Sequence, residues 1–180
     1  TGKTFFGRWL QERARARGFA ATEVQINETE TPLHRLETVY RRLVEHLGTA
    51  DTASGAFRGV IDGWFYALEQ DVLADSSVDP DDAAELLART DALMEARLST
   101  ISKTAPAFSA VLRTYRRALA AGDGMLADGL ISWLSGQPNV AASVKRAAGI
   151  KGDLDHFGAT NFLVGLLTIL RDSGFPGLVM

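Results

Sequence analysis

Apolar residues recur at three- and four-residue spacing through most of the chain, which is the pattern of amphipathic α-helices. The clearest example extends from Leu33 to Leu47, with Thr31 as its N-cap, Pro32 at the first helical position and Gly48 after its end. The same spacing predicts helices over residues 4–17, 57–72, 79–101, 106–119, 125–134, 140–148 and 154–172.

The ends of several predicted helices carry their own signals. Asp79 and Pro80 are expected to start the helix of residues 79–101, because acidic residues in a first turn interact favourably with the helix dipole. Gly18 and Gly122 stand where a left-handed C-terminal residue would end the helices before them.

Two segments instead have the features of strands. Residues 20–27 alternate apolar and polar side chains with a period of two, and Leu178–Met180 is a short apolar run after a turn. Two strands are too few for a three-layer α/β core, so we expect them to belong to a larger sheet and not to form one of their own. The first residue, Thr1, and the apolar last residues also suggest a piece of a longer protein.

Composition narrows the class of protein. Hydrophobic residues make up 46% of the 180 residues and charged residues 23%, which fits one globular core. There is no cysteine, which suits a reducing cytoplasm and excludes a disulfide framework or a thiol nucleophile. The longest apolar stretch, Phe162–Leu170, is too short to span a bilayer, so we expect a soluble, cytoplasmic protein.

Charge is unevenly distributed although the net charge is only −3. Residues 51–100 hold 11 acidic and 3 basic side chains, and this part would repel a phosphate backbone. Arginines before it could contact one, but a solvated helix face is the favoured interpretation of each cluster. These arginines are Arg13, Arg15, Arg17, Arg41 and Arg42.

The strongest chemical signal is at the start of the chain. Thr1, Gly2, Lys3 and Thr4 match the end of the phosphate-binding loop G-x-x-x-x-G-K-[ST]. The triplet alone is a weak signal, but a helix predicted to begin there and a strand after it supply the required context. In this interpretation Gly2 lets the backbone approach a phosphate, Lys3 reaches the β and γ phosphates of ATP, and the Thr4 hydroxyl coordinates Mg²⁺. The alternative is a helix N-cap with an exposed lysine.

Other candidate sites are weaker. His34, His46 and His156 lack metal-ligand spacing, and no serine is paired with a histidine at a recognisable spacing. Trp64 and its two aromatic neighbours could stack on bases, but their helical spacing with apolar residues favours a place in the core.

The motif and several longer stretches resemble the ATP-binding P-loop proteins of BREX-type phage-defence systems, relatives of the origin-recognition branch of the AAA+ ATPases. The resemblance rests on TGKTFFGRWLQERARARGF with ATEVQIN, on TPLHRLETVYRRLVEHL, on YRRALAAGDGMLADGLISWLSGQ and on NFLVGLLTILRDSGFPGLVM. Only the Walker A triplet Gly2, Lys3 and Thr4 is a functional motif, and it makes Lys3 the candidate catalytic residue.

Pattern and resemblance together imply a mostly α chain with a partial α/β P-loop NTPase core and a large helical insertion between two core strands. Residues 1–30 would begin the core, residues 31–173 would form the helical insertion, and residues 174–180 would begin the strand that leads to an acidic Walker B pair. Walker B, the sensor residues and any arginine finger are then expected outside these 180 residues, and we expect the isolated chain to be inactive.

The resemblance also implies a function: binding and hydrolysis of ATP with Mg²⁺ by an ATP-driven switch or motor that acts against foreign DNA. Its implied partners are ATP, DNA, other proteins of the defence system and further copies of itself through an AAA+ core, with no membrane. Two alternatives stay open at this point. One is a STAND-type signalling ATPase, and the other is a non-enzymatic helical module for protein interaction.

Overall fold

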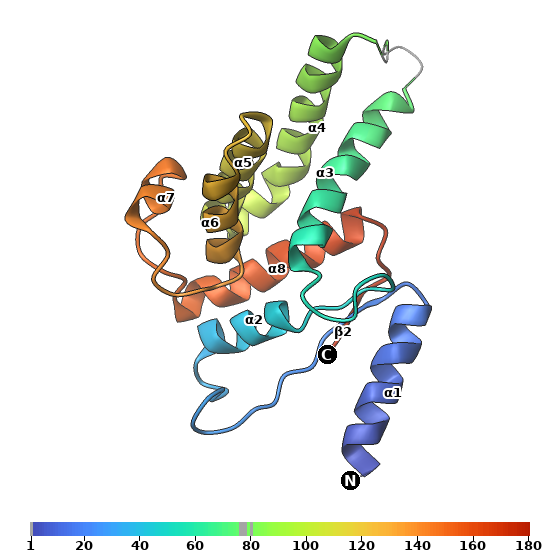
Figure 1. Ribbon diagram of the computed structural model, residues 1–180, viewed down its shortest axis with the longest axis vertical. Helices are drawn as coiled ribbons and strands as arrows, with labels where there is room; N and C mark the ends of the chain where they lie inside the picture. Colours follow the sequence, from blue (N-terminus) through green and yellow to red (C-terminus); the bar gives the residue numbers. More distant parts are fainter. Residues whose placement is uncertain (1, 76–78, 80) are drawn as a thin grey trace.

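The computed structural model describes residues 2–75, 79 and 81–180, and it is mostly helical, as predicted. Figure 1 shows the helices gathered into one body, from which the first helix stands apart. In chain order the elements are α1 (Gly2–Ala16), β1 (Ala20–Ala21), α2 (Leu36–Glu45), α3 (Phe57–Leu73), α4 (Ala83–Thr104), α5 (Pro106–Ala120), α6 (Gly124–Leu134), α7 (Ala142–Ala147), α8 (His156–Asp172) and β2 (Leu178–Val179).

Helix α8 holds the helical body together, because α2, α3 and α4 all contact it. Its Phe162 ring meets three other aromatic rings edge-on: Tyr40 of α2 at 5.9 Å, Phe108 of α5 at 5.1 Å and Trp133 of α6 at 5.2 Å between ring centroids. Such edge-to-face pairs add stability beyond the area that they bury. Helices from both halves of the chain therefore share a single core.

The two predicted strands lie where they were expected, but they are short and pair with each other. They run parallel, with Ala20 opposite Leu178 and Ala21 opposite Val179. The prediction of a strand over residues 20–27 was wrong beyond Ala21. Thr22 is buried and donates its hydroxyl to the Leu43 carbonyl at 2.7 Å, after which the chain leaves the ladder.

Helix α2 begins later than predicted, and Thr31 is not its N-cap. The Asn27 side-chain oxygen accepts hydrogen bonds from the backbone N–H groups of Thr29, Glu30 and Thr31, which closes a tight loop over residues 27–31. Thr31 is thereby held in that loop, and the helix starts only at Leu36. Pro32 and Leu33, predicted in the first turn, therefore lie before the helix, and Leu33 is 64% exposed. The apolar stripe is confirmed within the helix, where Tyr40, Leu43 and Val44 are buried.

Helix α4 is capped by a different aspartate from the one predicted. The Asp82 carboxylate accepts hydrogen bonds from the N–H groups of Ala84 at 3.1 Å and Glu85 at 3.0 Å, so Asp82 is the N-cap. Asp79 accepts a bond from the Asp81 N–H, outside the helix, and the predicted starting residue Pro80 lies outside the described residues. The first turn forms three residues after the predicted one.

This assignment can be tested by comparing two aspartates only three residues apart. Asp82→Ala should lower the free energy of unfolding by about 1 kcal/mol, because two backbone N–H groups lose their acceptor. Asp79→Ala should change it by less than about 0.5 kcal/mol. Chemical denaturation measures both, and a larger loss in Asp79→Ala would restore the cap predicted from sequence.

The remaining helix ends agree with the predictions to within about two or three residues. Gly18 and Gly122 adopt the left-handed conformation expected of helix stops, with φ of 81° and 69°. Leu87 and Leu119 were predicted on apolar helix faces, but they are 51% and 43% exposed. Within the described residues no helix is long and apolar enough to cross a bilayer.

Candidate functional site

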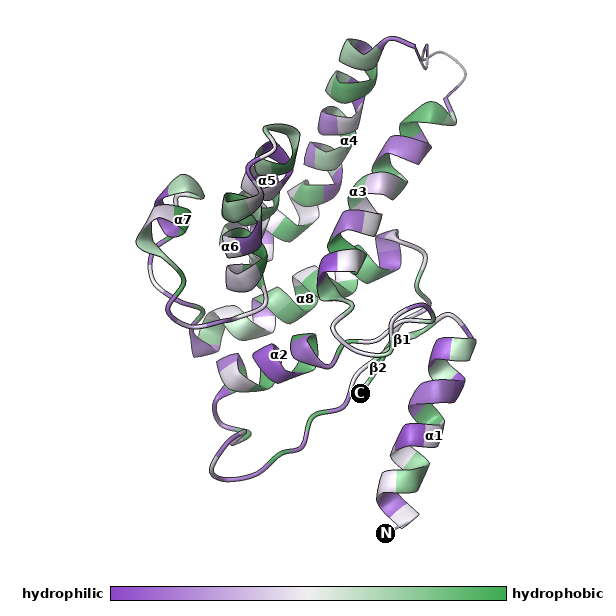
Figure 2. Cartoon of the chain, in the orientation of Figure 1, coloured by the Kyte–Doolittle hydropathy of each residue, from purple (hydrophilic) through white to green (hydrophobic). Residues whose placement is uncertain are grey.

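The residues that match the phosphate-loop motif lie at the N-terminal end of α1. The other end of this helix is attached to the body: Ala14 is buried, Gln11 donates to the Glu23 carboxylate at 3.0 Å, and Arg15 donates to the Ala53 carbonyl at 3.2 Å. Figures 1 and 2 show the N-terminal half of α1 projecting away from the helical body. The motif is therefore presented at the surface.

Gly2, Lys3 and Thr4 are all exposed and form the first turn of the helix, which confirms that a helix begins at the motif. Thr1 lies outside the described residues. The backbone N–H groups of a first turn have no partner within the helix, and the helix dipole places partial positive charge there. No acidic side chain occurs in this turn. An exposed turn with this charge and with Lys3 has the chemistry of an anion-binding site.

Gly2 has no packing function within the described chain. A Cβ added at this position would have no neighbouring atom within 4 Å, so the structure itself leaves room for a larger side chain. A group approaching the backbone from outside would explain why a residue without a side chain stands here.

The start of α1 and the end of the chain lie on the same side of the helical body. The N-terminus of α1 and the C-terminus of the chain, which follows β2, both lie below the helical body in Figure 1. Ligands of parallel α/β sheets bind beyond the carboxyl ends of the strands. A site of that kind would lie on the side of the molecule where the start of α1 and the end of β2 are found.

Apolar side chains of α1 form an exposed face further along the helix. The predicted helical spacing is confirmed, but Phe5, Phe6, Trp9 and Leu10 are 75%, 59%, 44% and 39% exposed. The rings of Phe6 and Trp9 stack at 5.8 Å, and the Arg13 guanidinium lies over Trp9 at 5.4 Å. This face does not contribute to the core of the helical body.

No metal site of protein side chains alone is found in the parts of the chain that the structure describes, because no three His, Asp or Glu residues gather there. Mg²⁺ at nucleotides does not need such a group, since phosphate oxygens and water supply most of its ligands. A single hydroxyl such as that of Thr4 fits this role. The residues present are therefore compatible with Mg²⁺ bound together with a nucleotide.

The other candidates from the sequence have structural explanations. Trp64 and Phe65 are buried and cannot stack on bases, whereas the neighbouring Tyr66 is 65% exposed. Arg41 and Arg42 are both within 4.0 Å of Glu45. Partial burial would raise the pKa of Glu45, but hydrogen bonds from Gln137 and Arg42 lower it on balance. These two arginines therefore already have an anionic partner.

One charged cluster could not be anticipated from sequence spacing. Arg113, Arg116 and Arg117 of α5 share a spacing of three and four residues, which places them near one another on that helix. Asp91 and Glu95 have the same kind of spacing on α4. Only the pairing of the two helices brings the acidic and basic groups together, beside a cavity between α4 and α5.

Comparison with protein families gives a match over the whole chain. The family model of BREX system ATP-binding proteins, BrxC/D, matches residues 1–180. No curated protein and no solved structure matches the chain significantly.

Proposed function

The chain belongs to the family of BREX system ATP-binding proteins BrxC/D, and we propose that Thr1, Gly2, Lys3 and Thr4 form the end of its ATP-binding loop. The observation that carries this proposal is the exposed first turn of α1, where the motif is followed by a helix and then by a strand in a parallel pair. ATP binding in phage defence is what the family suggests.

Each residue of the motif has a distinct part in this proposal. The N–H groups of the first turn, with Gly2 allowing close approach, bind phosphate oxygens. The Lys3 ammonium group interacts with the β and γ phosphates, and the Thr4 hydroxyl is one ligand of Mg²⁺. The ion, when bound, neutralises charge that develops on the phosphates during transfer. The Lys3 ammonium group would offset charge on the same phosphates, so we assign it a part in catalysis as well as in binding.

We further propose that α1, β1 and β2 belong to a P-loop NTPase core of the AAA+ type, and that residues 31–173 are a helical insertion between its strands. Two observations support this division. The strands are parallel and adjacent although some 150 residues separate them, and the aromatic core around Phe162 joins helices of the insertion without any residue of α1. An ATP-driven switch or motor that acts on DNA, alone or as an assembly of copies, is the function that fits such a core.

Phosphate release tests whether the parent protein is an ATPase. Full-length protein should turn over ATP with Mg²⁺, whereas the 180-residue chain should not. Hydrolysis needs an acidic residue at the metal and a group that orients the attacking water, and our proposal assigns to this chain only Lys3 and Thr4. Both should be assayed with and without DNA. Steady turnover by the 180-residue chain would mean that its catalytic groups lie among residues assigned here to packing.

Titration with nucleotide separates this proposal from a non-enzymatic interaction module. A STAND-type signalling ATPase would bind ATP through the same residues, and its output would differ. A non-enzymatic interaction module would not bind ATP with Mg²⁺ at all. If calorimetry on the full-length protein detects no binding of ATP, the proposal is contradicted. The interaction module is then the remaining function.

A further inference from the structure

A groove lies between α4 and α5 on the side of the helical body away from α1 and the strands. Its cavity has a volume of about 900 Å³ and is lined by apolar side chains together with charged side chains of both helices. Phe65 and Met94 form a buried floor, each 5% exposed, while Leu87 and Leu119 are about half exposed at its edges. Half-exposed leucines beside a buried apolar surface are typical of a site that binds a protein partner or a ligand.

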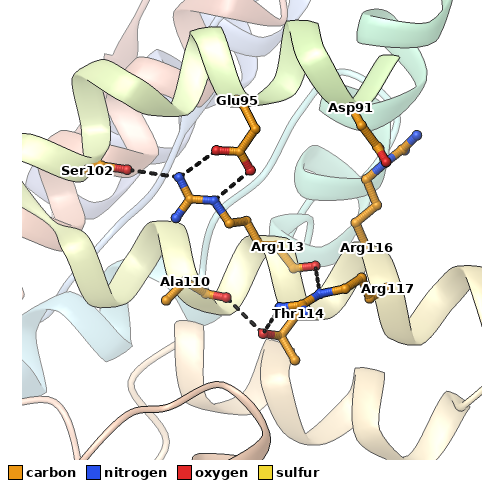
Figure 3. Close-up of polar contacts among 8 residues, drawn as sticks. All are labelled: Asp91, Glu95, Ser102, Ala110, Arg113, Thr114, Arg116 and Arg117. Carbon is orange, nitrogen blue, oxygen red and sulfur yellow. Dashed lines mark hydrogen bonds and ion pairs between the residues drawn. The ribbon is translucent and has the colours of Figure 1, made fainter. Parts of the chain in front are cut away.

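Two ion pairs cross the groove and hold its walls in place. The Arg113 guanidinium donates two hydrogen bonds to the Glu95 carboxylate, at 2.7 and 2.8 Å, and a third to the Ser102 hydroxyl at 3.3 Å (Figure 3). The hydrogen bonds from Arg113 also lower the pKa of Glu95. Arg116 donates to Asp91 at 2.8 Å and lies over the Phe65 ring at 5.6 Å. Both carboxylates that line the groove are thus neutralised by arginines of α5.

A third arginine has no such partner. Arg117 is exposed and donates only to the Arg113 carbonyl at 3.4 Å and to the Thr114 hydroxyl at 3.3 Å, on its own helix (Figure 3). Among the described residues no carboxylate lies within 4.0 Å of its guanidinium. The groove therefore carries one surplus positive charge, because its lining holds two carboxylates and three arginines.

We propose that this groove binds an amphipathic helix of a partner protein, with apolar residues on Leu87, Met94 and Leu119 and an acidic residue paired with Arg117. A groove between two long helices suits an apolar helix face. The surplus charge at Arg117 calls for a carboxylate by charge complementarity. A nucleic acid is a poor match, because Asp91 and Glu95 line the same groove. This proposal is independent of ATP binding by α1.

The partner segment can be identified by site-specific crosslinking. A photo-crosslinking amino acid in place of Leu119 should be introduced into the full-length protein, in cells that contain the complete defence system. Met125 on α6, 86% exposed and not among the groove-lining residues, is the matched control position. We expect a crosslink from position 119 alone, to an amphipathic segment of another protein with at least one acidic residue.

Binding of that segment as a synthetic peptide then tests the chemistry. Fluorescence anisotropy should show about tenfold weaker binding to Arg117→Glu, and a similar or greater loss for Leu119→Asp. Arg146→Glu, an exposed arginine of α7, is the matched control and should bind normally. An arginine in place of the acidic residue of the peptide should restore binding to Arg117→Glu.

Several results would overturn the proposal. They are a crosslink to nucleic acid, to a second copy of this chain or to another part of the same polypeptide, and the absence of any crosslink specific to position 119. Equal peptide binding by the Arg117→Glu and Arg146→Glu proteins would also overturn it, as would the failure of the charge exchange to restore binding.

Discussion

Lys3→Ala in the full-length protein should weaken the binding of ATP with Mg²⁺ by about ten- to a hundredfold. The proposed contact is a charge-assisted hydrogen bond between the Lys3 ammonium group and phosphate oxygens, and bonds of this kind contribute about 1.5–3 kcal/mol. Isothermal calorimetry measures the affinity. Because Lys3 is exposed in the first turn of α1, the variant should fold normally and keep the far-ultraviolet dichroism of the native protein.

Arg8→Ala is the matched control for this experiment. Arg8 is also exposed and positively charged on α1, but it lies beyond the first turn. The Arg8→Ala protein should bind ATP nearly as well as the native protein. Salt screens the long-range attraction between Arg8 and the phosphates, whereas it hardly weakens a direct contact. If Lys3→Ala binds ATP as well as the native protein does, or if Arg8→Ala loses as much affinity, Lys3 does not contact the phosphates and the motif is only a helix start.

Trp64→Ala should destabilise the protein by about 3–5 kcal/mol. The indole is completely buried in the core, beside the Phe65 ring at a centroid distance of 5.1 Å, and its removal leaves a large cavity. For a chain of this size the loss corresponds to a fall of roughly 6–20 °C in the midpoint of thermal unfolding. Differential scanning calorimetry measures this shift.

Tyr66→Ala provides the comparison on the same helix. Tyr66 is 65% exposed, so its removal should change the free energy of unfolding by less than about 0.5 kcal/mol. The contrast between these near neighbours tests the burial of α3 directly. A thermal midpoint that Trp64→Ala leaves unchanged would place the indole at the surface and bring back the possibility that it stacks on bases.

The positions of the helices could be predicted because their signal is local. On α3 the residues Val60, Ile61, Trp64, Leu68 and Val72 repeat at three- and four-residue spacing, and all of them are buried. The same reasoning located the motif at the start of α1, because a phosphate loop is itself a short local sequence. A pattern confined to one or two helical turns indicates a helix and its inner face without knowledge of the rest of the chain.

Capping was predicted less well, because the same kind of polar side chain can either cap a helix or hold the backbone of a nearby loop. At α2 the side chain of Asn27 holds the backbone of Thr31 in a loop, and at α4 the helix begins at Asp82 in preference to Asp79. Asparagine and aspartate form local turns as readily as they cap helices. Propensity alone does not decide between the two uses.

By itself the sequence determined that this is a mostly helical protein with a phosphate-loop motif at the start of a helix, because periodicity and short motifs are encoded by neighbouring residues. The tertiary structure alone decided that β1 pairs with β2, that Leu87 and Leu119 stay exposed, and that no carboxylate of the described residues lies opposite Arg117. These features depend on contacts between residues far apart in the chain. Only the packing of helices and strands against one another fixes which of those contacts form.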